Sequence, residues 1–118
     1  MRTIALTLAL LAAALRPEAA SAHAHLDHAS PAVGSTVAEP PHDLTIWFTQ
    51  NLEPAFSTVQ VMDANGARVD DEHAAISGDT MRVGLMALAP GAYKVHWHAV
   101  SVDTHTTEGD FTFTVGGK

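Results

Sequence analysis

Residues 91–100 decide the fold class, and they read Gly91-Ala92-Tyr93-Lys94-Val95-His96-Trp97-His98-Ala99-Val100. In an extended strand, successive side chains point to opposite faces of the sheet. One face of this stretch is therefore apolar, with Tyr93, Val95, Trp97 and Ala99. The other face is more polar, with Lys94, His96, His98 and Val100. The stretch, which follows a Pro90-Gly91 turn, predicts a long β-strand buried on one side.

Shorter segments on either side repeat this alternation and are separated by Gly, Pro, Asn and Asp. After a polar loop at 101–108, Phe111, Phe113 and Val115 alternate with polar residues, which predicts an antiparallel partner for the long strand. No segment favours a helix, so we expect an all-β sandwich or barrel. The other predicted strands are an edge strand at 24–29, a core strand with Leu44, Ile46 and Phe48, a strand with Val59 and Val61 that ends in a turn at 63–66, and one with Met81, Val83 and Leu85.

The segment from Arg68 to Asp79 is polar, and the acidic run Asp70-Asp71-Glu72 lies at its centre. Runs of this kind are usually solvated, so we expect an exposed loop. His28, His42 and His73 lie in or beside polar stretches, and their expected position is also the surface. His96 and His98 are predicted to lie on the half-exposed face of the long strand, where surface or structural roles are more common than metal ligation.

The N-terminus has the pattern of a secretory signal peptide. Arg2 precedes a 13-residue apolar run, Thr3 to Leu15, and Ala20-Ser21-Ala22 has the small-x-small pattern of a cleavage site. The run is shorter than the about 20 residues that span a bilayer as a helix. We therefore expect a cleaved signal peptide at 1–22 and an exported domain at 23–118 that does not span the membrane. Cleavage after Ala24 is the alternative.

The composition of the expected mature chain favours a cation as the ligand. The whole chain has 13 acidic and 6 basic residues, of which 12 and 4 remain when Glu18, Arg2 and Arg16 leave with the signal peptide. All eight histidines remain, and there is no cysteine. A strongly acidic domain is a poor partner for nucleic acid, and without thiolates a soft-metal site is not expected. Acidic residues and histidines together suggest metal binding.

Cleavage after Ala22 would make His23 the first residue, and a terminal histidine is an unusual metal ligand. Its α-amine and its imidazole Nδ1 can chelate one ion, a nitrogen donor pair that Cu(II) prefers and for which Ni(II) competes. His25 is the third residue of that chain. The amine, the two following backbone amides and the His25 imidazole could instead bind copper as an unfolded tail, so direct ligation by His25 is left open.

Asp103 and His105 form the second candidate element, because a carboxylate and an imidazole two residues apart lie on one side of an extended segment. With His23 they would offer an amine, two imidazoles and a carboxylate, which suits tetragonal Cu(II) and is poor for Cu(I). Solvated turn residues are the alternative interpretation. Met62, Met81 and Met86 lie in separate segments and predict no methionine site. No catalytic motif is present, so we expect no enzyme.

The chain resembles the CopC family, also called PcoC, of periplasmic copper-resistance proteins. The resemblance runs through the expected mature chain and rests on several short motifs. They are His-Ala-His-Leu at 23–26, Ser-Pro-Ala-Val-Gly-Ser-Thr-Val at 30–37, the strand at 44–48, Gly-x-Tyr-x-Val-x-Trp at 91–97, Val-Ser-Val-Asp-Thr-His at 100–105 and Gly-Asp-Phe-Thr-Phe-Thr-Val at 109–115.

The resemblance implies a seven-stranded Greek-key β-barrel or sandwich of immunoglobulin-like or cupredoxin-like type. It also implies Cu(II) held by His23, Asp103 and His105. This chain lacks the methionine-rich loop of family members with a Cu(I) site, so it is expected to bind Cu(II) alone. The implied partner is a CopD-like inner-membrane copper transporter, and we expect a monomer. There are two alternatives. One is an interaction module that binds copper incidentally through its tail, and the other is a copper-dependent oxidase.

Overall fold

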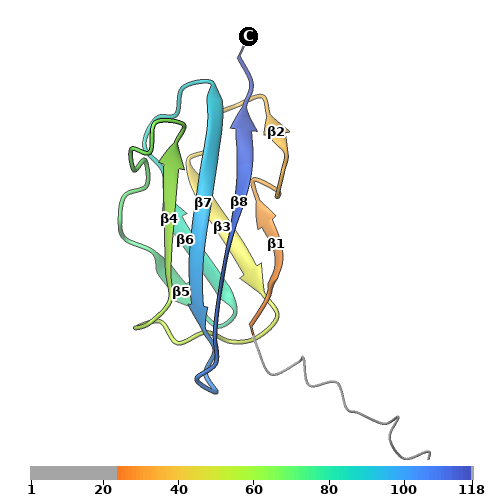
Figure 1. Cartoon of the computed structure of the whole chain (residues 1–118), viewed down its shortest axis with the longest axis vertical. Coiled ribbons are helices and arrows are strands. Elements are labelled where there is room, and N and C mark those ends of the chain that lie inside the picture. The colour runs from red at the N-terminus through yellow and green to blue at the C-terminus, as the bar shows by residue number, and fades with distance from the viewer. Residues whose placement is uncertain (1–23, 118) are drawn as a thin grey trace, which may run out of the picture.

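The computed structural model describes residues 24–117. Every regular secondary-structure element in this range is a β-strand. The expected all-β class is therefore confirmed. The resemblance implied seven strands, whereas the described residues contain eight, one of them only two residues long. The strands are β1 (Leu26–Ser30), β2 (Thr36–Val37), β3 (Asp43–Phe48), β4 (Thr58–Asp63), β5 (Ala75–Ser77), β6 (Thr80–Gly84), β7 (Gly91–Val100) and β8 (Thr106–Val115) (Figure 1).

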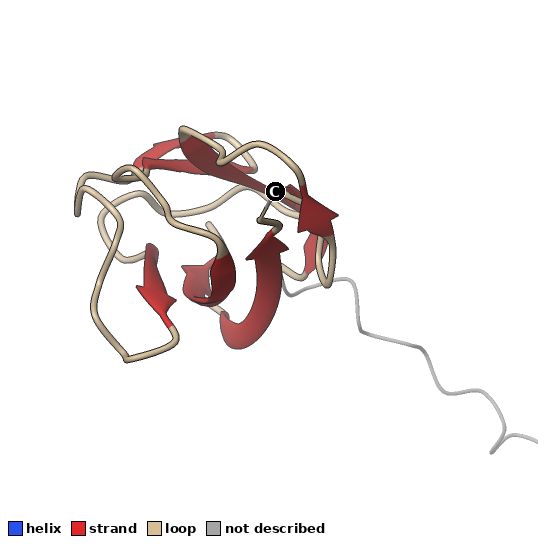
Figure 2. Cartoon of the chain, turned by 90° about the horizontal axis from the view of Figure 1, so that it is seen from above, coloured by secondary structure: helices blue, strands red, loops and turns tan. Residues whose placement is uncertain are grey.

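The strands form two four-stranded sheets. One has the order β1-β3-β6-β5 and the other the order β2-β8-β7-β4. Seen from above, the strands lie in two layers (Figure 2). Apart from β5 with β6 and β7 with β8, consecutive strands lie in different sheets. The fold is a sandwich with chain crossings between its layers, as in Greek-key sandwiches, and not a closed barrel.

The core lies between the two sheets and is built from the alternate positions that the sequence pattern predicts. On β3, Leu44, Ile46 and Phe48 are buried, and Met81 on β6 is completely buried beside them. Phe48 of one sheet meets Trp97 of the other edge to face, with ring centroids 5.2 Å apart. Burial of these apolar side chains is the main stabilising contribution, because there is no disulfide to constrain the chain.

The expected antiparallel pair of long strands is confirmed, and it forms the centre of its sheet. β7 and β8 pair over their whole length, from Gly91 opposite Val115 to Val100 opposite Thr106. Trp97 lies opposite Gly109. A Cβ at position 109 would lie 2.7 Å from Cζ2 of the indole, so the missing side chain of Gly109 is what leaves room for the ring.

The prediction that residues 68–79 form one exposed, solvated loop is wrong for its centre. Asp70 is 1% exposed, and its carboxylate accepts hydrogen bonds from the amide of Val61 at 2.7 Å and the amide of Glu72 at 2.8 Å. The guanidinium of Arg68 pairs with it at 2.9 Å. Strand β5 also lies within this segment. A run of acidic residues cannot reveal that one of them turns inward to bind backbone amides.

The pKa of Asp70 records the balance of these contacts. Burial of the carboxyl group by itself would raise its pKa, but the hydrogen bonds from Arg68 and from the amides of Val61 and Glu72 outweigh that effect and lower the pKa. Asp70 is therefore a buried anion that ties the segment to β4.

Within residues 24–117, no helix is long and apolar enough to cross a membrane.

Candidate metal centre

The connection between β7 and β8 is a tight turn at residues 101–105. The amide of Thr104 donates to the carbonyl of Ser101 at 2.8 Å, and the amide of Ser101 donates to the carbonyl of His105 at 2.9 Å. Thr104 has a left-handed backbone, with φ of 73°. The expectation that Asp103 and His105 lie along an extended segment is therefore wrong. Chain reversal, and not strand alternation, brings their side chains together.

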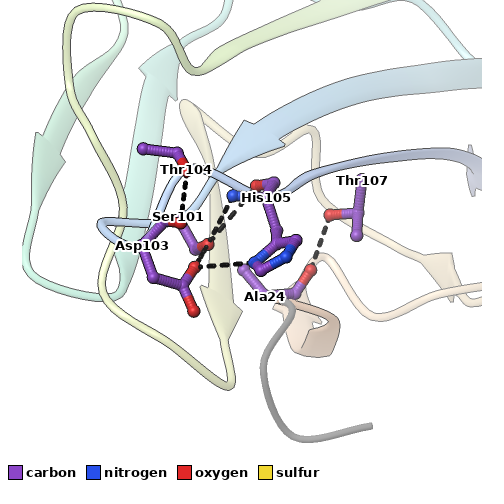
Figure 3. Close-up of polar contacts among 6 residues, drawn as sticks. All are labelled: Ala24, Ser101, Asp103, Thr104, His105 and Thr107. Carbon is purple, nitrogen blue, oxygen red and sulfur yellow. Dashed lines mark hydrogen bonds and ion pairs between the residues drawn. The ribbon is translucent and has the colours of Figure 1, made fainter. Parts of the chain in front are cut away.

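Ser101 organises this turn from the inside (Figure 3). It is 1% exposed, and a β-bridge to Leu52 fixes its backbone. Its hydroxyl donates a hydrogen bond to the carboxylate of Asp103 and accepts one from the amide of His105 at 3.3 Å. One buried hydroxyl group therefore sets the positions of both candidate ligands.

The carboxylate of Asp103 and the imidazole of His105 form a polar pair at the surface. Oδ1 of Asp103 lies 3.2 Å from Nδ1 of His105. The hydrogen bond from Ser101 and the contact with His105 lower the pKa of Asp103, so its carboxylate is ionised at neutral pH. Two donors that each lie about 2.0 Å from one ion, at right angles, are about 2.8 Å apart. A small adjustment would allow both groups to bind the same ion.

The first described residues are held beside this turn. Ala24 is completely buried, and its carbonyl accepts a 2.6 Å hydrogen bond from the hydroxyl of Thr107 at the start of β8 (Figure 3). The amide of His25 donates to Oγ1 of Thr49 at 2.9 Å, and the amide of Thr49 donates back to the carbonyl of His25 at 2.9 Å. The chain therefore enters the sandwich next to β8, the strand that begins directly after the turn with the candidate ligands.

The structure describes three of the four candidate ligands that the sequence suggested. Asp103 and His105 are brought together, and the exposed residue His25 lies one residue from Ala24. His23 and the expected signal peptide at 1–22 lie outside the described residues. Within residues 24–117, no three His, Cys, Asp or Glu side chains are arranged to hold a metal ion.

The remaining histidines lie at the surface or on a half-exposed face, as expected. His42 and His73 are exposed, and His28 is exposed while its ring stacks on Trp47 with centroids 4.3 Å apart. His96 and His98 lie on the outer face of β7. The methionines of the described chain lie on separate segments, and Met81 is a core residue.

Sequence reasoning missed Ser101 and Thr107, the two residues that position the candidate site. Each had a signal. Ser101 is a polar residue directly after the buried end of a long strand. Thr107 shares the inward-facing parity of Phe111 and Phe113 on β8, and a polar residue at an inward position usually has a specific hydrogen-bond partner.

Comparison with known proteins places these features in a family. Residues 26–116 match the family model of the CopC domain. The chain is 33% identical to the protein YobA of Escherichia coli, over 97% of this chain and 95% of that protein. It is 32% identical to copper resistance protein C of Xanthomonas campestris, over 97% of this chain and 96% of that protein. The copper transport protein CutJ of Bacillus subtilis is 30% identical over 85% of this chain, which corresponds to 19% of CutJ.

Solved structures agree with this result. The crystal structure of CopC from Methylosinus trichosporium OB3b superposes with a TM-score of 0.75 at 32% identity, over 80% of this chain and 94% of that one. PcoC from E. coli, described as a methionine-rich copper resistance protein, superposes with a TM-score of 0.70 at 30% identity, over 79% of this chain and 98% of that one. Sequence and fold lead to one conclusion: this chain belongs to the CopC family, and its relatives include proteins named for copper resistance and copper transport.

Proposed function

We propose that this protein is a periplasmic Cu(II)-binding protein that sequesters or transports copper. Cu(II) would be held by the α-amine and imidazole of His23, the carboxylate of Asp103 and the imidazole of His105. The observation that carries the proposal is the hydrogen bond from Thr107 to the carbonyl of Ala24. It ties the N-terminal end of the described chain to the strand that begins directly after His105.

Covalent geometry supports this convergence. Residue 23 is bonded to Ala24, so their Cα atoms are about 3.8 Å apart. Thr107 lies two residues beyond His105, which is about 7 Å along a strand. A histidine with a free amine at position 23 could therefore reach the Asp103–His105 pair without any rearrangement of the sandwich.

The donor types favour Cu(II) over Cu(I). Nitrogen and carboxylate ligands suit tetragonal Cu(II), whereas Cu(I) prefers thiolate or thioether ligands. The chain has no cysteine, and its methionines do not cluster in the described part of the chain. The lowered pKa of Asp103 keeps an anionic ligand available at neutral pH without competition from a proton.

The alternative mode, in which copper binds to an unfolded N-terminal tail, is disfavoured by the same contacts. That mode needs the backbone amide of His25 to lose its proton and bind the metal. In the folded protein this amide donates to Oγ1 of Thr49. We therefore propose that His25 packs beside the site, with direct ligation of copper by its imidazole as the second possibility.

Export and hand-over complete the proposal. The signal-peptide pattern at 1–22 supports secretion to the periplasm, and removal of that peptide after Ala22 would create the free amine of His23. The chain corresponds to 19% of the copper transport protein CutJ, so a domain of this kind occurs as one part of a longer copper transport protein. This supports transfer of copper to a CopD-like inner-membrane transporter. We propose a monomeric carrier and not an enzyme, because four equatorial donors leave little room for oxygen.

Titration of the processed protein with Cu(II) tests the site. We expect one tightly bound equivalent with the electron paramagnetic resonance spectrum of tetragonal Cu(II). Affinity should collapse when one glycine precedes His23, since the amine then lies one residue too far from the imidazole, and when His105→Ala removes a nitrogen donor. His73→Ala is the matched control, because His73 is exposed and lies on another loop.

Two results would reject the proposal. One is unchanged tight affinity in both the glycine-extended protein and His105→Ala. The other is a peptide of residues 23–28 that binds copper as tightly as the whole protein, because this would favour incidental binding by the tail. Intact mass of the exported protein, with and without copper, establishes the first residue and the stoichiometry. Oxygen consumption with ascorbate and the copper-loaded protein should not exceed that of free copper.

A further inference from the structure

Four ionisable side chains gather on the outer face of the β7–β8 pair, apart from the Asp103–His105 turn. His96 lies opposite Asp110, and His98 lies opposite Glu108. All four positions have the parity that points away from the core, since Trp97 and Phe111 face inward. The imidazoles of His96 and His98 are each 37% exposed. The cluster is therefore open to solvent and accessible to an ion.

One carboxylate oxygen faces both imidazoles. Oε1 of Glu108 lies 3.2 Å from Nε2 of His96 and 4.0 Å from Nδ1 of His98. Donors that each lie about 2.0 Å from one ion are about 2.8 Å apart at right angles and about 3.3 Å apart in a tetrahedron. The pair of His96 and Glu108 already falls in this range.

His98 has to move for the set to close. Its 4.0 Å separation from Glu108 exceeds the tetrahedral value by less than 1 Å. As they stand, these side chains are not arranged to hold an ion, in agreement with the lack of any such set among residues 24–117. Rotation of a partly exposed imidazole on a strand face would bring the third donor into place without a change in the backbone.

Asp110 contacts the second ring nitrogen of His96, as the outer partner of a metal-binding histidine does. Its Oδ1 lies 2.8 Å from Nδ1 of His96. With a metal bound, a carboxylate there would accept the proton of Nδ1 and leave the lone pair of Nε2 for an ion held between His96 and Glu108. Histidines that bind metals almost always donate their other ring nitrogen to a carboxylate or carbonyl in this way, and the partner sets the tautomer and the ring orientation.

The charges at the cluster also favour a cation. Glu108 and Asp110 are the two acidic members of the cluster, and metal ligation requires the imidazoles in their neutral form. The neighbouring strand β4 contributes only Gln60 opposite His96 and Thr58 opposite His98, neither of which is charged. Lys94 lies on the same face, two residues before His96. With Lys94 counted, the two carboxylates still leave one net negative charge at this face.

We propose that His96, His98 and Glu108 form a second metal site, with Asp110 as the residue that orients His96, and that it binds a second Cu(II) ion. Two imidazoles and a carboxylate suit Cu(II), which binds such donors more tightly than Zn(II). The site begins three residues before Ser101, about 10 Å along the strand. It is weaker than the terminal site because it has three ligands and no chelating amine. The protein would then hold two copper ions at once.

Titration with Cu(II) alone, followed by ¹⁵N NMR, tests this site independently of the first. We expect the second equivalent to broaden the amides of residues 95–99 and 107–111. Glu108→Gln and the double change His96→Ala with His98→Ala should abolish this second equivalent. Asp110→Asn should weaken it about tenfold to a hundredfold, the range found for outer partners of metal ligands. In each variant the first equivalent should remain.

The matched controls are His42→Ala and His73→Ala, two exposed histidines on other segments, which should leave the second equivalent unchanged. Zn(II) added at an equal concentration to the protein with two copper ions should not displace the second ion, because Cu(II) binds these donors more tightly. The proposal is overturned if the second equivalent persists in Glu108→Gln and in the double variant, or if its broadening centres on His28, His42 or His73. Because Glu108 and both histidines lie on the surface, the midpoint of urea unfolding should be the same for these variants as for the wild type.

Discussion

The hydroxyl of Thr107 donates a 2.6 Å hydrogen bond to the carbonyl of Ala24, a residue 83 positions earlier in the chain. This contact joins the N-terminal end of the described chain to β8, close to the turn that carries Asp103 and His105. Ala24 is completely buried. The contact therefore positions the segment that leads to residue 23, and it does so with a side chain that would not itself bind metal.

Thr107→Val should loosen that attachment while keeping the shape of the side chain. Loss of one hydrogen bond costs about 1 kcal/mol, so we expect Cu(II) affinity to fall about fivefold. Competition titration against a copper chelator would measure the change. Thr112→Val, on the exposed face of the same strand, is the control. Equal affinities for the two variants would show that the contact does not order the copper-binding terminus.

Ser101→Ala should disorder the candidate ligands together. The hydroxyl of Ser101 is the main reason that the pKa of Asp103 is lowered, so its removal should raise that pKa toward the ordinary value. An NMR titration of the Asp103 carboxyl in metal-free protein would measure the shift. Copper affinity should fall about tenfold to a hundredfold, as for other outer partners of metal ligands. Ser77→Ala, at an exposed position on β5, should change neither quantity.

Asp70→Ala should be the most destabilising of these substitutions. It removes the acceptor for the amides of Val61 and Glu72 and leaves Arg68 without its partner. We expect a loss of about 3 kcal/mol in the free energy of unfolding, measured with urea on metal-free protein. Asp71→Ala is the control, since Asp71 is exposed. A similar loss in both variants would contradict the role of Asp70 as a buried tie.

The titration of Asp70 should contribute to the loss of stability at acid pH. Its pKa is lower in the folded protein than in the unfolded chain, where an aspartate titrates near about 3.9. Its contribution is therefore complete above that pH and is lost as the pH falls below it. The free energy of unfolding should decrease more steeply between about pH 4 and pH 2 in the wild type than in Asp70→Asn. Parallel curves would assign the acid dependence to other carboxylates.

Gly109→Ala should destabilise the sandwich through a clash with Trp97. The new Cβ would lie 2.7 Å from Cζ2 of the indole and 3.0 Å from Cε2, so the ring has to move within the core. Overpacking of this kind costs about 1 to 3 kcal/mol, which urea unfolding followed by tryptophan fluorescence would detect. The control is Gly116→Ala, where the nearest atoms lie at 3.6 Å. Wild-type stability for Gly109→Ala would mean that the indole relocates at no cost.

The strands could be predicted because each depends on its own residues. Alternation of apolar and polar side chains identified β3, β7 and β8 and their inward faces, since a strand turns successive side chains to opposite sides. The same reasoning failed at residues 68–79. Composition reports average solvation, and one carboxylate in an acidic run can be buried when backbone amides of another strand satisfy it, as Val61 does for Asp70.

By itself, the sequence determined the all-β class, the long pair of strands, the acidic and histidine-rich character, and the candidate ligands Asp103 and His105. Only the tertiary structure decided that these two meet through a left-handed turn at Thr104, that Ser101 holds both, and that Thr107 holds Ala24. It also decided that Glu108 faces both His96 and His98. The physical reason is that strand periodicity is local, whereas these contacts depend on the register between strands and on chain reversals, which packing of the whole sandwich sets.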